Sequence, residues 1–340
     1  NDVNVSGNLE VDGLATFNNN VNVYGNLDVS GRVNLNNILI LDGFASFYDS
    51  VDVSGNLNVS QDISVSGNLN VFDNLNVDGA VDLINTFTQL GSDIYGEAAN
   101  DQSGYSVSLS NDGTIVAIGA PYNDGANGSD SGHVRVYQWN SSTTSWSQLG
   151  SDIDGEAAND ESGYSVSLSR NGKIVAIGAK QHSTNTGQVR VYKYRTISEN
   201  EFNNSNVATE QSEIYSSTKE YWIQKGDDID GESGSDESGY SVSLSNDGTR
   251  VAIGAIKNNG INGTDSGHAR VYEYNSTTSL WVQLGSDIDG ESGGDNFGYS
   301  VSLSGDGTIV AIGAPYNDGT NTDSGHVRVY KWNGISWNQL

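Results

Sequence analysis

The chain has 340 residues, of which 35% are apolar, and 43 acidic against 15 basic side chains give it a formal net charge of -28. That charge repels nucleic-acid phosphates and anionic lipid headgroups, so we expect no nucleic-acid partner. Cysteine is absent, which excludes disulfides and thiolate metal sites. No apolar run is long enough to span a membrane and no leader-like segment is present, so we expect a mature or excised chain without membrane insertion.

Residues 3–86 divide into fourteen consecutive hexapeptides, from VNVSGN at 3–8 to VDLINT at 81–86. The first position of every unit is apolar and the third is always Val, Leu or Phe, whereas the second and fourth are mostly polar. This alternation predicts a short strand with one buried face in each unit. Stacked units of this kind would bury a shared core, so we expect a β-solenoid over 1–86.

The fifth position of the hexapeptide is typical of a corner. Eight units have glycine there, and the others have Asn, Asp or Gln. These residues tolerate a positive φ, so we expect positive-φ corners between the strands. The glycines are Gly7, Gly13, Gly25, Gly31, Gly43, Gly55, Gly67 and Gly79.

The hexapeptide pattern resembles the left-handed β-helix, in which three units form one coil, and this resemblance implies four to five coils. The Val or Leu at position one departs from that family, which has a smaller residue there. The repeated VSGNLNV style is also similar to the trimeric stalks of viral and phage fibres, so single-chain and triple-stranded forms both remain open. We expect a spacer without a ligand site, with a solvated Asn-rich outer face.

From Phe87 onward the period changes to about sixty residues, and four copies follow near 87–145, 146–221, 222–280 and 281–340. Glycines in the shared GYSVSLS segment are spaced by 59, 76 and 59 residues. Each copy holds four alternating runs, YSVSLS, TIVAIGA, HVRVYQW and WSQLG in the first, with a tight Asn-Asp-Gly hairpin after the first run. Four antiparallel strands per copy predict one β-propeller blade, and hence an all-β chain.

The segment FGYSVSLSGDGTIVAIGAP at 297–315 resembles the FG-GAP repeat of integrin-type β-propellers and of many large secreted or viral proteins. Such blades usually come in sevens, whereas this chain has four complete copies after a leading FTQL at 87–90. A closed four-bladed ring and a longer array both remain open. The family often binds calcium between its first two strands, but the short hairpin here cannot supply the roughly six to eight oxygens required. We therefore do not transfer that site.

A second acidic cluster lies between copies, in loops such as SDIDGEAANDESG. Its carboxylates are candidate ligands for calcium, the one cofactor we consider. Alternatively, they cap the turn and pair with the arginines that recur in the third strand, at 135, 190, 270 and 328. In the first copy, Tyr95 stands where the other copies have the second aspartate, so that copy has one carboxylate fewer. The candidates are Asp152, Asp154, Glu156, Asp160, Asp228, Asp230, Glu232, Asp236, Asp287, Asp289, Glu291 and Asp295.

Histidine recurs at 133, 268 and 326, and Gln188 takes its place in the second copy. Because a catalytic group is normally unique, this recurrence favours a hydrogen-bonding role, and we expect no enzyme activity. A secreted carbohydrate-active enzyme is the weakest alternative. The tryptophans of the third and fourth strands are expected to pack between blades, with stacking on sugar rings as the alternative.

An insertion at 195–219 lengthens the second copy, and because it is not repeated it is a candidate for individual function. Seven Asn-x-Ser/Thr sequons occur, and four of them fall in expected blade loops, which makes them candidate glycosylation sites in a secreted chain. These four are Asn127, Asn140, Asn262 and Asn275.

The order of the modules, a rod followed by blades, predicts a structural or adhesion protein located extracellularly, on a cell surface or on a virion surface. In this hypothesis the solenoid presents the propeller to a surface protein or glycan. The alternative is self-association, as a trimer or as the subunit of an extracellular filament.

Overall fold

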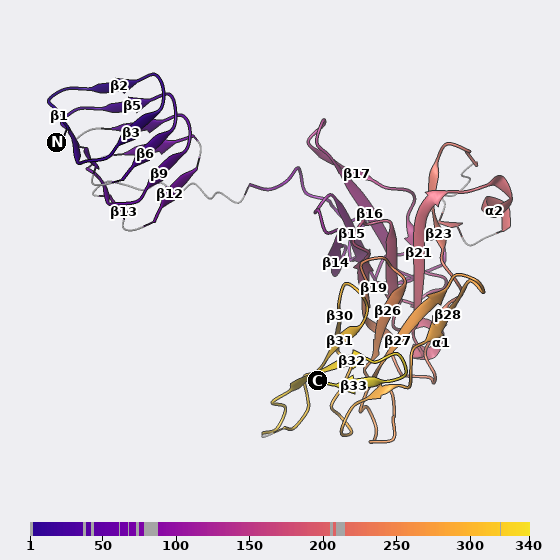
Figure 1. Cartoon of the computed structure of the whole chain (residues 1–340). Helices are drawn as coiled ribbons and strands as arrows, with labels where there is room; N and C mark the ends of the chain where they lie inside the picture. Colours follow the sequence, from indigo (N-terminus) through magenta and orange to yellow (C-terminus); the bar gives the residue numbers. More distant parts are fainter. Residues whose placement is uncertain are drawn as a thin grey trace. The chain divides into compact units, whose positions relative to one another are not determined.

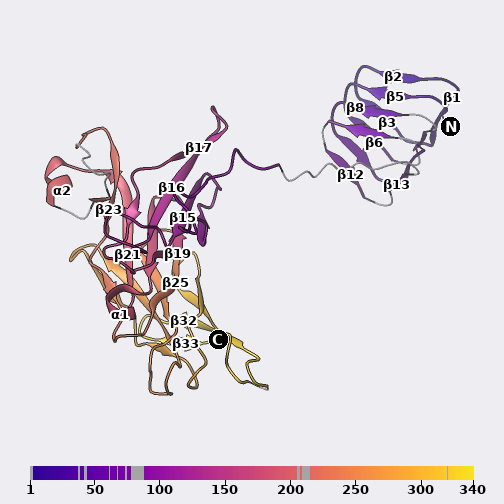
Figure 2. The same cartoon turned by 180° about the vertical axis from the view of Figure 1, so that it is seen from behind.

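The computed structural model describes residues 3–36, 39–41, 44–60, 62–66, 68–72, 75–77, 88–204, 207–208, 215–319 and 321–340. The chain forms two compact units, Asn1–Thr88 and Gln89–Leu340. The expected all-β architecture is confirmed: the first unit is a solenoid of short parallel strands, and the second consists of antiparallel four-stranded sheets (Figures 1 and 2).

The solenoid coils on itself, because each strand pairs in parallel with the strand eighteen residues along, as Val3 does with Val21. Three hexapeptides therefore make one coil. The first sheet contains β1 (Val3–Val5), β4 (Val21–Val23), β7 (Leu39–Leu41), β10 (Leu57–Val59) and β13 (Leu75–Val77). The second contains β2 (Leu9–Val11), β5 (Leu27–Val29), β8 (Ala45–Phe47) and β11 (Ile63–Val65). The third contains β3 (Ala15–Phe17), β6 (Val33–Leu35), β9 (Val51–Val53) and β12 (Leu69–Val71).

The first and third positions of the hexapeptides form the solenoid core. Leu27, Leu39 and Leu57, all at position one, are completely buried, and Phe47 at position three is 1% exposed. The large position-one side chains are thus accommodated inside the coil. The fourteenth unit, 81–86, lies outside the described residues.

The corner glycines correct one expectation, because Gly7, Gly13, Gly25 and Gly31 do not have positive φ. Their small size serves a different purpose. A Cβ on Gly31 would lie 2.7 Å from the Gly13 carbonyl oxygen, one coil away. Glycine is required there because the corners of successive coils stack backbone against backbone.

The outer face of the solenoid is also more ordered than a merely solvated surface. Asn22 donates its side-chain amide to the Asn4 side-chain oxygen at 2.7 Å, and Asn36 does the same to Asn18 at 2.9 Å. Each pair joins residues eighteen positions apart, so the asparagines bond to one another along the stack.

The second unit contains four blades, whose strands we call first to fourth in chain order. Blade 1 has β14 (Ser106–Leu109), β15 (Ile115–Ala120), β16 (His133–Asn140) and β17 (Ser145–Gln148). Blade 2 has β19 (Ser162–Leu168), β20 (Ile174–Ala179), β21 (Gln188–Thr196) and β23 (Glu220–Gln224). Blade 3 has β25 (Ser238–Leu244), β26 (Arg250–Ala255), β27 (His268–Asn275) and β28 (Leu280–Gln283). Blade 4 has β30 (Ser300–Leu303), β31 (Ile309–Ala314), β32 (His326–Trp332) and β33 (Trp337–Gln339).

Neighbouring blades pack through the apolar faces of their sheets. Between blades 1 and 2, Val134 and Val136 contact Val166 and Leu168 in one buried cluster. Serine hydroxyls cross the same junctions: Ser106 donates to the Gly163 carbonyl at 2.7 Å. Equivalent bonds follow at the next two junctions, so the first strands line up side by side along the array.

The insertion of blade 2 adds structure beyond the repeat. It contributes α2 (Glu199–Asn204) and β22 (Val207–Ala208), which pairs with β23. Phe202 and Tyr215 pack against Tyr221 and Ile223 in a small separate core. A four-residue segment, α1 (His182–Asn185), lies between β20 and β21. Among the described residues, no helix has the length and apolar character needed to cross a membrane.

Candidate functional site

The acidic loops between blades hold their carboxylates in four distinct surroundings. The first carboxylate of each loop is anchored by glutamine from the preceding fourth strand: Gln148 donates to Asp152 Oδ1 at 2.6 Å. The same bond joins Gln224 to Asp228 and Gln283 to Asp287. This anchor fixes one carboxylate oxygen, and the other oxygen, Oδ2, of Asp152 and of Asp287 faces the preceding blade.

The second acidic position lies in a two-residue strand that the sequence did not indicate. These strands, β18 (Ile153–Asp154), β24 (Ile229–Asp230) and β29 (Ile288–Asp289), pair with the third strand of the preceding blade. Their backbone carbonyls also accept a guanidinium of the following blade, as Asp154 O does from Arg190 Nη2 at 2.7 Å. Burial raises the pKa of Asp289.

The glutamate of each loop pairs with the third-strand arginine of its own blade. The distances from arginine Nη1 to glutamate Oε1 are 3.6 Å for Arg190 and Glu156 and 3.4 Å for Arg270 and Glu232. The remaining pairs, Arg135 with Glu97 and Arg328 with Glu291, are also 3.4 Å apart. The sequence analysis gave two roles for these acidic residues, calcium binding or pairing with the third-strand arginines. These contacts are of the second kind.

The last carboxylate of each loop caps the turn. Asp160 Oδ2 accepts the Ala157 N–H at 2.9 Å and lies 3.0 Å from His182 Nδ1. Asp236 and Asp295 accept the equivalent N–H groups, from Ser233 and Ser292. All three are buried, and each also pairs with a side chain that follows the second strand of its blade: His182, Asn258 and Asn317 respectively. The structure therefore directs the four acidic positions of one loop toward different neighbours.

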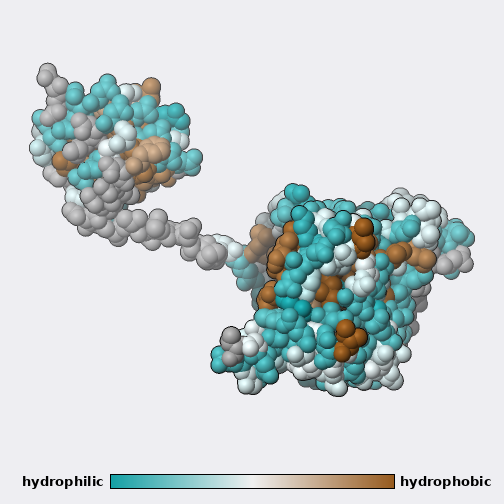
Figure 3. Space-filling model, turned by 60° about the horizontal axis from the view of Figure 1, so that its bottom comes forward, coloured by the Kyte–Doolittle hydropathy of each residue, from teal (hydrophilic) through white to brown (hydrophobic). Residues whose placement is uncertain are grey.

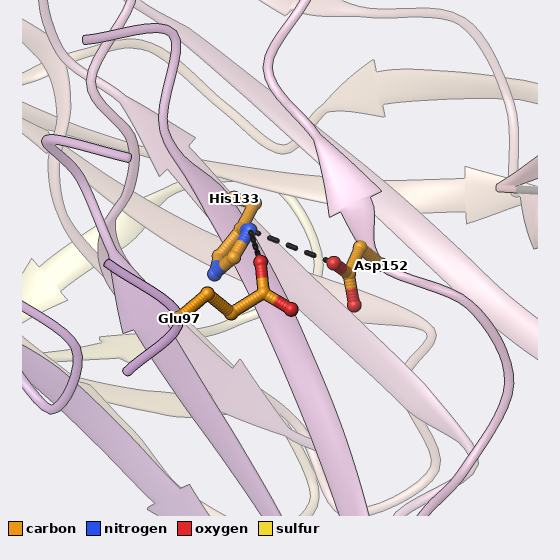
Figure 4. A group of neighbouring side chains, drawn as sticks. All are labelled: Glu97, His133 and Asp152. Atoms are coloured by element: carbon orange, nitrogen blue, oxygen red, sulfur yellow. Dashed lines mark ion pairs between the residues drawn. The ribbon is translucent and has the colours of Figure 1, made fainter. Parts of the chain in front are cut away.

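Carboxylates from successive loops do converge on the third-strand histidine. His133 begins β16, where its side chain is 2% exposed. Its Nδ1 lies 3.9 Å from Glu97 Oε2 and 3.8 Å from Asp152 Oδ2 (Figure 4). Burial, followed by the charge of Arg135, lowers the pKa of His133. The imidazole is therefore neutral at pH 7 and faces two carboxylates.

Blade 3 repeats this arrangement. His268 Nδ1 lies 4.0 Å from Glu232 Oε2 and 3.9 Å from Asp287 Oδ2. Burial, reinforced by Arg270, lowers the pKa of His268 to about 4. The sequence analysis named the Asp, Glu and His residues but assigned the carboxylates and the histidines to separate roles. It did not predict β29, whose pairing with β27 brings the next loop against the histidine.

Blades 2 and 4 vary the arrangement. Gln188 takes the place of histidine in blade 2 and donates to Glu156 Oε2 at 3.2 Å. In blade 4, His326 Nδ1 lies 3.7 Å from Glu291 Oε2.

The aspartates of the short hairpins are used within the turn. Asp112 Oδ1 accepts hydrogen bonds from the Ser110 hydroxyl at 2.7 Å and from the Thr114 N–H at 3.0 Å. These bonds, the serine bond first, lower the pKa of Asp112 to about 2. Asn171 makes the same two kinds of bond in blade 2.

The four loop sequons fall into two classes. Asn127 and Asn262 each donate their side-chain amide to a loop carbonyl at 2.6 Å, so a glycan on that nitrogen would break a structural bond. Within the described residues, the hydrogen bonds of the Asn140 and Asn275 side chains use the oxygen, which accepts N–H groups two and three residues ahead. The geometry therefore favours Asn140 and Asn275 as acceptors.

The fourth-strand tryptophans hold blades together. Trp222 donates its indole N–H to the Leu149 carbonyl at 2.7 Å and is completely buried. Trp146, Trp281 and Trp337 make the equivalent bond, to Leu90, Lys225 and Leu284 respectively. These contacts agree with the expected packing role.

A row of tyrosines crosses the four blades at the start of their first strands. The ring centres of Tyr105 and Tyr164 are 4.9 Å apart, those of Tyr164 and Tyr240 are 5.1 Å apart, and those of Tyr240 and Tyr299 are 5.0 Å apart. Tyr105 is 46% exposed and Tyr299 is 40% exposed. Lys180 Nζ lies 4.4 Å from the Tyr164 ring centre. We call these four residues the tyrosine row.

Comparison with known families agrees with the blade repeat. The FG-GAP repeat matches residues 96–137, 229–272 and 287–330. The chain carries FG-GAP repeats. The resemblance expected from 297–315 is thereby confirmed, and the matched segments lie in blades 1, 3 and 4. Blade 2, which has the insertion, shares their strand order. A search of curated proteins found no match.

Several solved structures resemble the chain at low identity. The periplasmic gluconolactonase PpgL of Pseudomonas aeruginosa is 14% identical, with a TM-score of 0.42 and 69% of this chain covered. Hydrazine synthase of Kuenenia stuttgartiensis is 11% identical, with a TM-score of 0.38 and 73% covered. A putative 6-phosphogluconolactonase from Bacteroides uniformis is 10% identical, with a TM-score of 0.36 and 70% of each chain covered. The chain spans 55% and 53% of the first two structures.

Proposed function

We propose that this chain is a structural and adhesion protein of an extracellular, cell or virion surface, in which the solenoid presents the blades to a surface protein or glycan. It acts by binding and not by catalysis. The observation that carries the proposal is the tyrosine row, a continuous aromatic surface built from equivalent positions of all four blades.

Tyrosine suits such a surface because its ring provides apolar contact area while its hydroxyl hydrogen-bonds to a partner. The row is rigid, because the inner rings Tyr164 and Tyr240 are half-buried between their neighbours. Burial, with a further contribution from the hydrogen bond with Tyr299, raises the pKa of Tyr240 to about 12, so its hydroxyl stays neutral and can donate. Exposed Tyr105 and Tyr299 flank these two rings and offer the accessible contact area.

The test is binding of the full chain to a glycan array and to a panel of purified extracellular protein domains. We expect Tyr105→Ala and Tyr299→Ala each to weaken the binding that the wild-type chain shows by about tenfold, as expected for a contact worth about 1.4 kcal/mol. Tyr48→Ala is the matched control, because Tyr48 is 65% exposed on the solenoid. Binding that is unchanged in both row variants would contradict the proposal.

A second candidate function, self-association through the blades, is favoured by the end faces of the array. Val107 and Leu109 of blade 1 are 64% and 59% exposed, whereas the equivalent Val166 and Leu168 of blade 2 are 9% and 8% exposed. At the other end, Val327 is 66% exposed, and its equivalent Val134 is completely buried. Figure 3 shows exposed apolar side chains on this unit.

These two faces are the two halves of one junction. In the interior of the array, a surface like that around Val327 packs on a surface like that around Val107. A second copy of this chain can therefore extend the array head to tail, as a heterologous contact.

Sedimentation velocity of the full chain tests this candidate. We expect Leu109→Lys and Val327→Lys to abolish association separately, since each contact uses both faces. An equimolar mixture of the two variants retains one intact face of each kind and should form dimers only. Leu280→Lys is the control, at an exposed residue of the fourth strand of blade 3. A wild-type chain that stays monomeric at high concentration would exclude this function.

A further inference from the structure

The histidine of blade 3 lies buried between two carboxylates without a hydrogen bond. His268 is 1% exposed, and neither of its ring nitrogens has a hydrogen-bond partner in the described part of the chain. Leaving a buried polar group without a hydrogen bond destabilises a fold, so a histidine in this position calls for an explanation. The ring is aimed at an acidic pair, as its equivalent is in Figure 4.

We propose that Glu232, His268 and Asp287 bind a divalent transition metal of the zinc type, and that Glu97, His133 and Asp152 form a second, equivalent site. In each group the three ligand atoms lie within 4.8 Å of one another. Each group supplies one imidazole nitrogen and two carboxylate oxygens, which leaves a position for water. These donor types are ones that Zn²⁺ accepts.

The geometry requires only a small adjustment for binding. Ligand atoms at about 2.0–2.1 Å from a tetrahedral zinc ion lie roughly 3.3 Å apart, and the nitrogen-to-oxygen separations here are 3.9 and 4.0 Å. Glu232 can provide the movement because its side chain is 44% exposed. Asp287 is held in place, since Gln283 donates to its other oxygen at 2.7 Å. Such an outer partner is typical of ligating carboxylates.

The local charge also suits a dication. Glu232 and Asp287 contribute two negative charges, and the Arg270 guanidinium, 3.4 Å from the far oxygen of Glu232, offsets one of them. The histidine distinguishes this site from a calcium site, because calcium takes about six to eight oxygen ligands. The proposed sites use Asp152, Glu232 and Asp287 from the candidate calcium ligands and add a histidine to each carboxylate pair.

In each site one carboxylate comes from the segment before the blade and the other from the loop after it. Glu232 precedes blade 3 and Asp287 follows it, with His268 beneath them on β27. A bound ion would link the two loops across the blade and raise its stability by mass action. Blade 2 shows the alternative without a metal, since the Gln188 amide donates directly to Glu156.

The experiment measures zinc bound to the full chain. After treatment with chelator, the chain is dialysed against micromolar free Zn²⁺, and the bound metal is counted by elemental analysis. We expect two ions for the wild-type chain and one each for His133→Gln and His268→Gln. The double variant should bind none. Glutamine is the conservative replacement because Gln188 already occupies this position in blade 2.

Two further variants sharpen the count. Gln188→His should create a third site, because Gln188 already bonds Glu156, and Asp228 has the same glutamine anchor as Asp152 and Asp287. His182→Gln should leave the count at two, since His182, in α1 between β20 and β21, pairs with Asp160 and belongs to neither group. Cobalt substitution gives a second readout: visible d–d bands should disappear with the double histidine variant. A wild-type chain without bound zinc, or a double variant that retains it, overturns the proposal.

Discussion

The solenoid and the blades both stack repeats, but they join the repeats by different bonds. In the solenoid, the backbone ladders run between repeats, because each strand pairs with the strand eighteen residues along. In the blades, the ladders stay within one repeat, and the junctions consist of apolar side chains, serine hydroxyls and indole N–H groups. Backbone pairing thus needs a short, regular sequence, whereas side-chain junctions tolerate a long repeat with an insertion.

The glycines show the same difference. In the solenoid, Gly31 is needed where two corners stack. In the blades, Gly178 is needed where the second strand meets the first strand of the next blade, because a Cβ there would overlap the Gly239 carbonyl oxygen. Both glycines allow two backbone segments to approach closely. At the blade position, the room for a Cβ depends on whether a neighbouring blade packs against the strand.

The largest expected effect separates the two units. Phe47→Ala should destabilise the solenoid by about 3–5 kcal/mol, because it leaves a cavity in a core where Phe47 is 1% exposed. All six tryptophans lie at 139 or beyond, so tryptophan fluorescence reports on the blades alone, while far-ultraviolet circular dichroism reports on both units. We expect the part of the unfolding transition seen only by circular dichroism to shift to milder conditions. The unfolding transition seen by tryptophan fluorescence should stay unchanged. Tyr48→Ala, at an exposed neighbour, is the control.

The next effect compares an interior junction with the end of the array. Gly178→Ala should destabilise the blades by about 3 kcal/mol, because the added methyl group clashes with backbone. Gly313→Ala at the equivalent position of blade 4 should cost less. Its added Cβ would meet only the Ser300 hydroxyl oxygen, at 2.6 Å, which can rotate away. Denaturant unfolding followed by fluorescence measures both, and equal losses would contradict the account of the junctions.

A similar pair tests the solenoid corners. Gly31→Ala should cost about 1–3 kcal/mol, because the new Cβ would approach the Gly13 backbone. Gly13→Ala should be nearly neutral, since a Cβ there has no atom within 4 Å. Thermal unfolding followed by circular dichroism distinguishes them. If positive φ were the reason for glycine, both variants would lose stability alike.

The smallest effect concerns the hairpins in acid. The folded pKa of Asp112 and of Asp306 is about 2, below the ordinary 3.8, because turn hydrogen bonds favour the carboxylate. A lowered pKa stabilises the fold above pH 3.8, and this contribution is lost as the pH falls toward 2. Asp112→Asn with Asp306→Asn should therefore unfold less steeply in acid. The natural Asn171 of blade 2 indicates that the turn itself survives, and an unchanged acid transition would contradict this assignment.

Most of the fold could be predicted from the sequence, because the hexapeptide repeat and the longer blade repeat are both visible in it. The buried first and third positions of the hexapeptide and the four strands of each blade follow from alternation and from the hairpin signals. The positive-φ expectation for the corners was wrong, since a sequence shows that glycine is present without showing whether φ or close approach requires it. Gly31 is explained by contact with a residue eighteen positions away.

The candidate site was less accessible to sequence reasoning. Asp152 and Glu156 stand close together in sequence, yet Asp152 faces His133 of one blade and Glu156 faces Gln188 of the next. The division depends on β18, only two residues long, which carries too little pattern to be recognised in advance. The tyrosine row was missed for a similar reason: each blade supplies a single ring, and the surface exists only when the blades are aligned.

Because paired strands lie eighteen residues apart, the solenoid can change its length in steps of one whole coil. Duplication or deletion of one whole coil leaves every remaining side chain facing inward or outward as before, and changes the rod by about 4.8 Å, the spacing of paired strands. A gain or loss of six residues would move each strand to a different sheet while preserving its inward face. Relatives of this chain whose solenoids differ in length should therefore differ by multiples of eighteen residues in the region equivalent to 3–86.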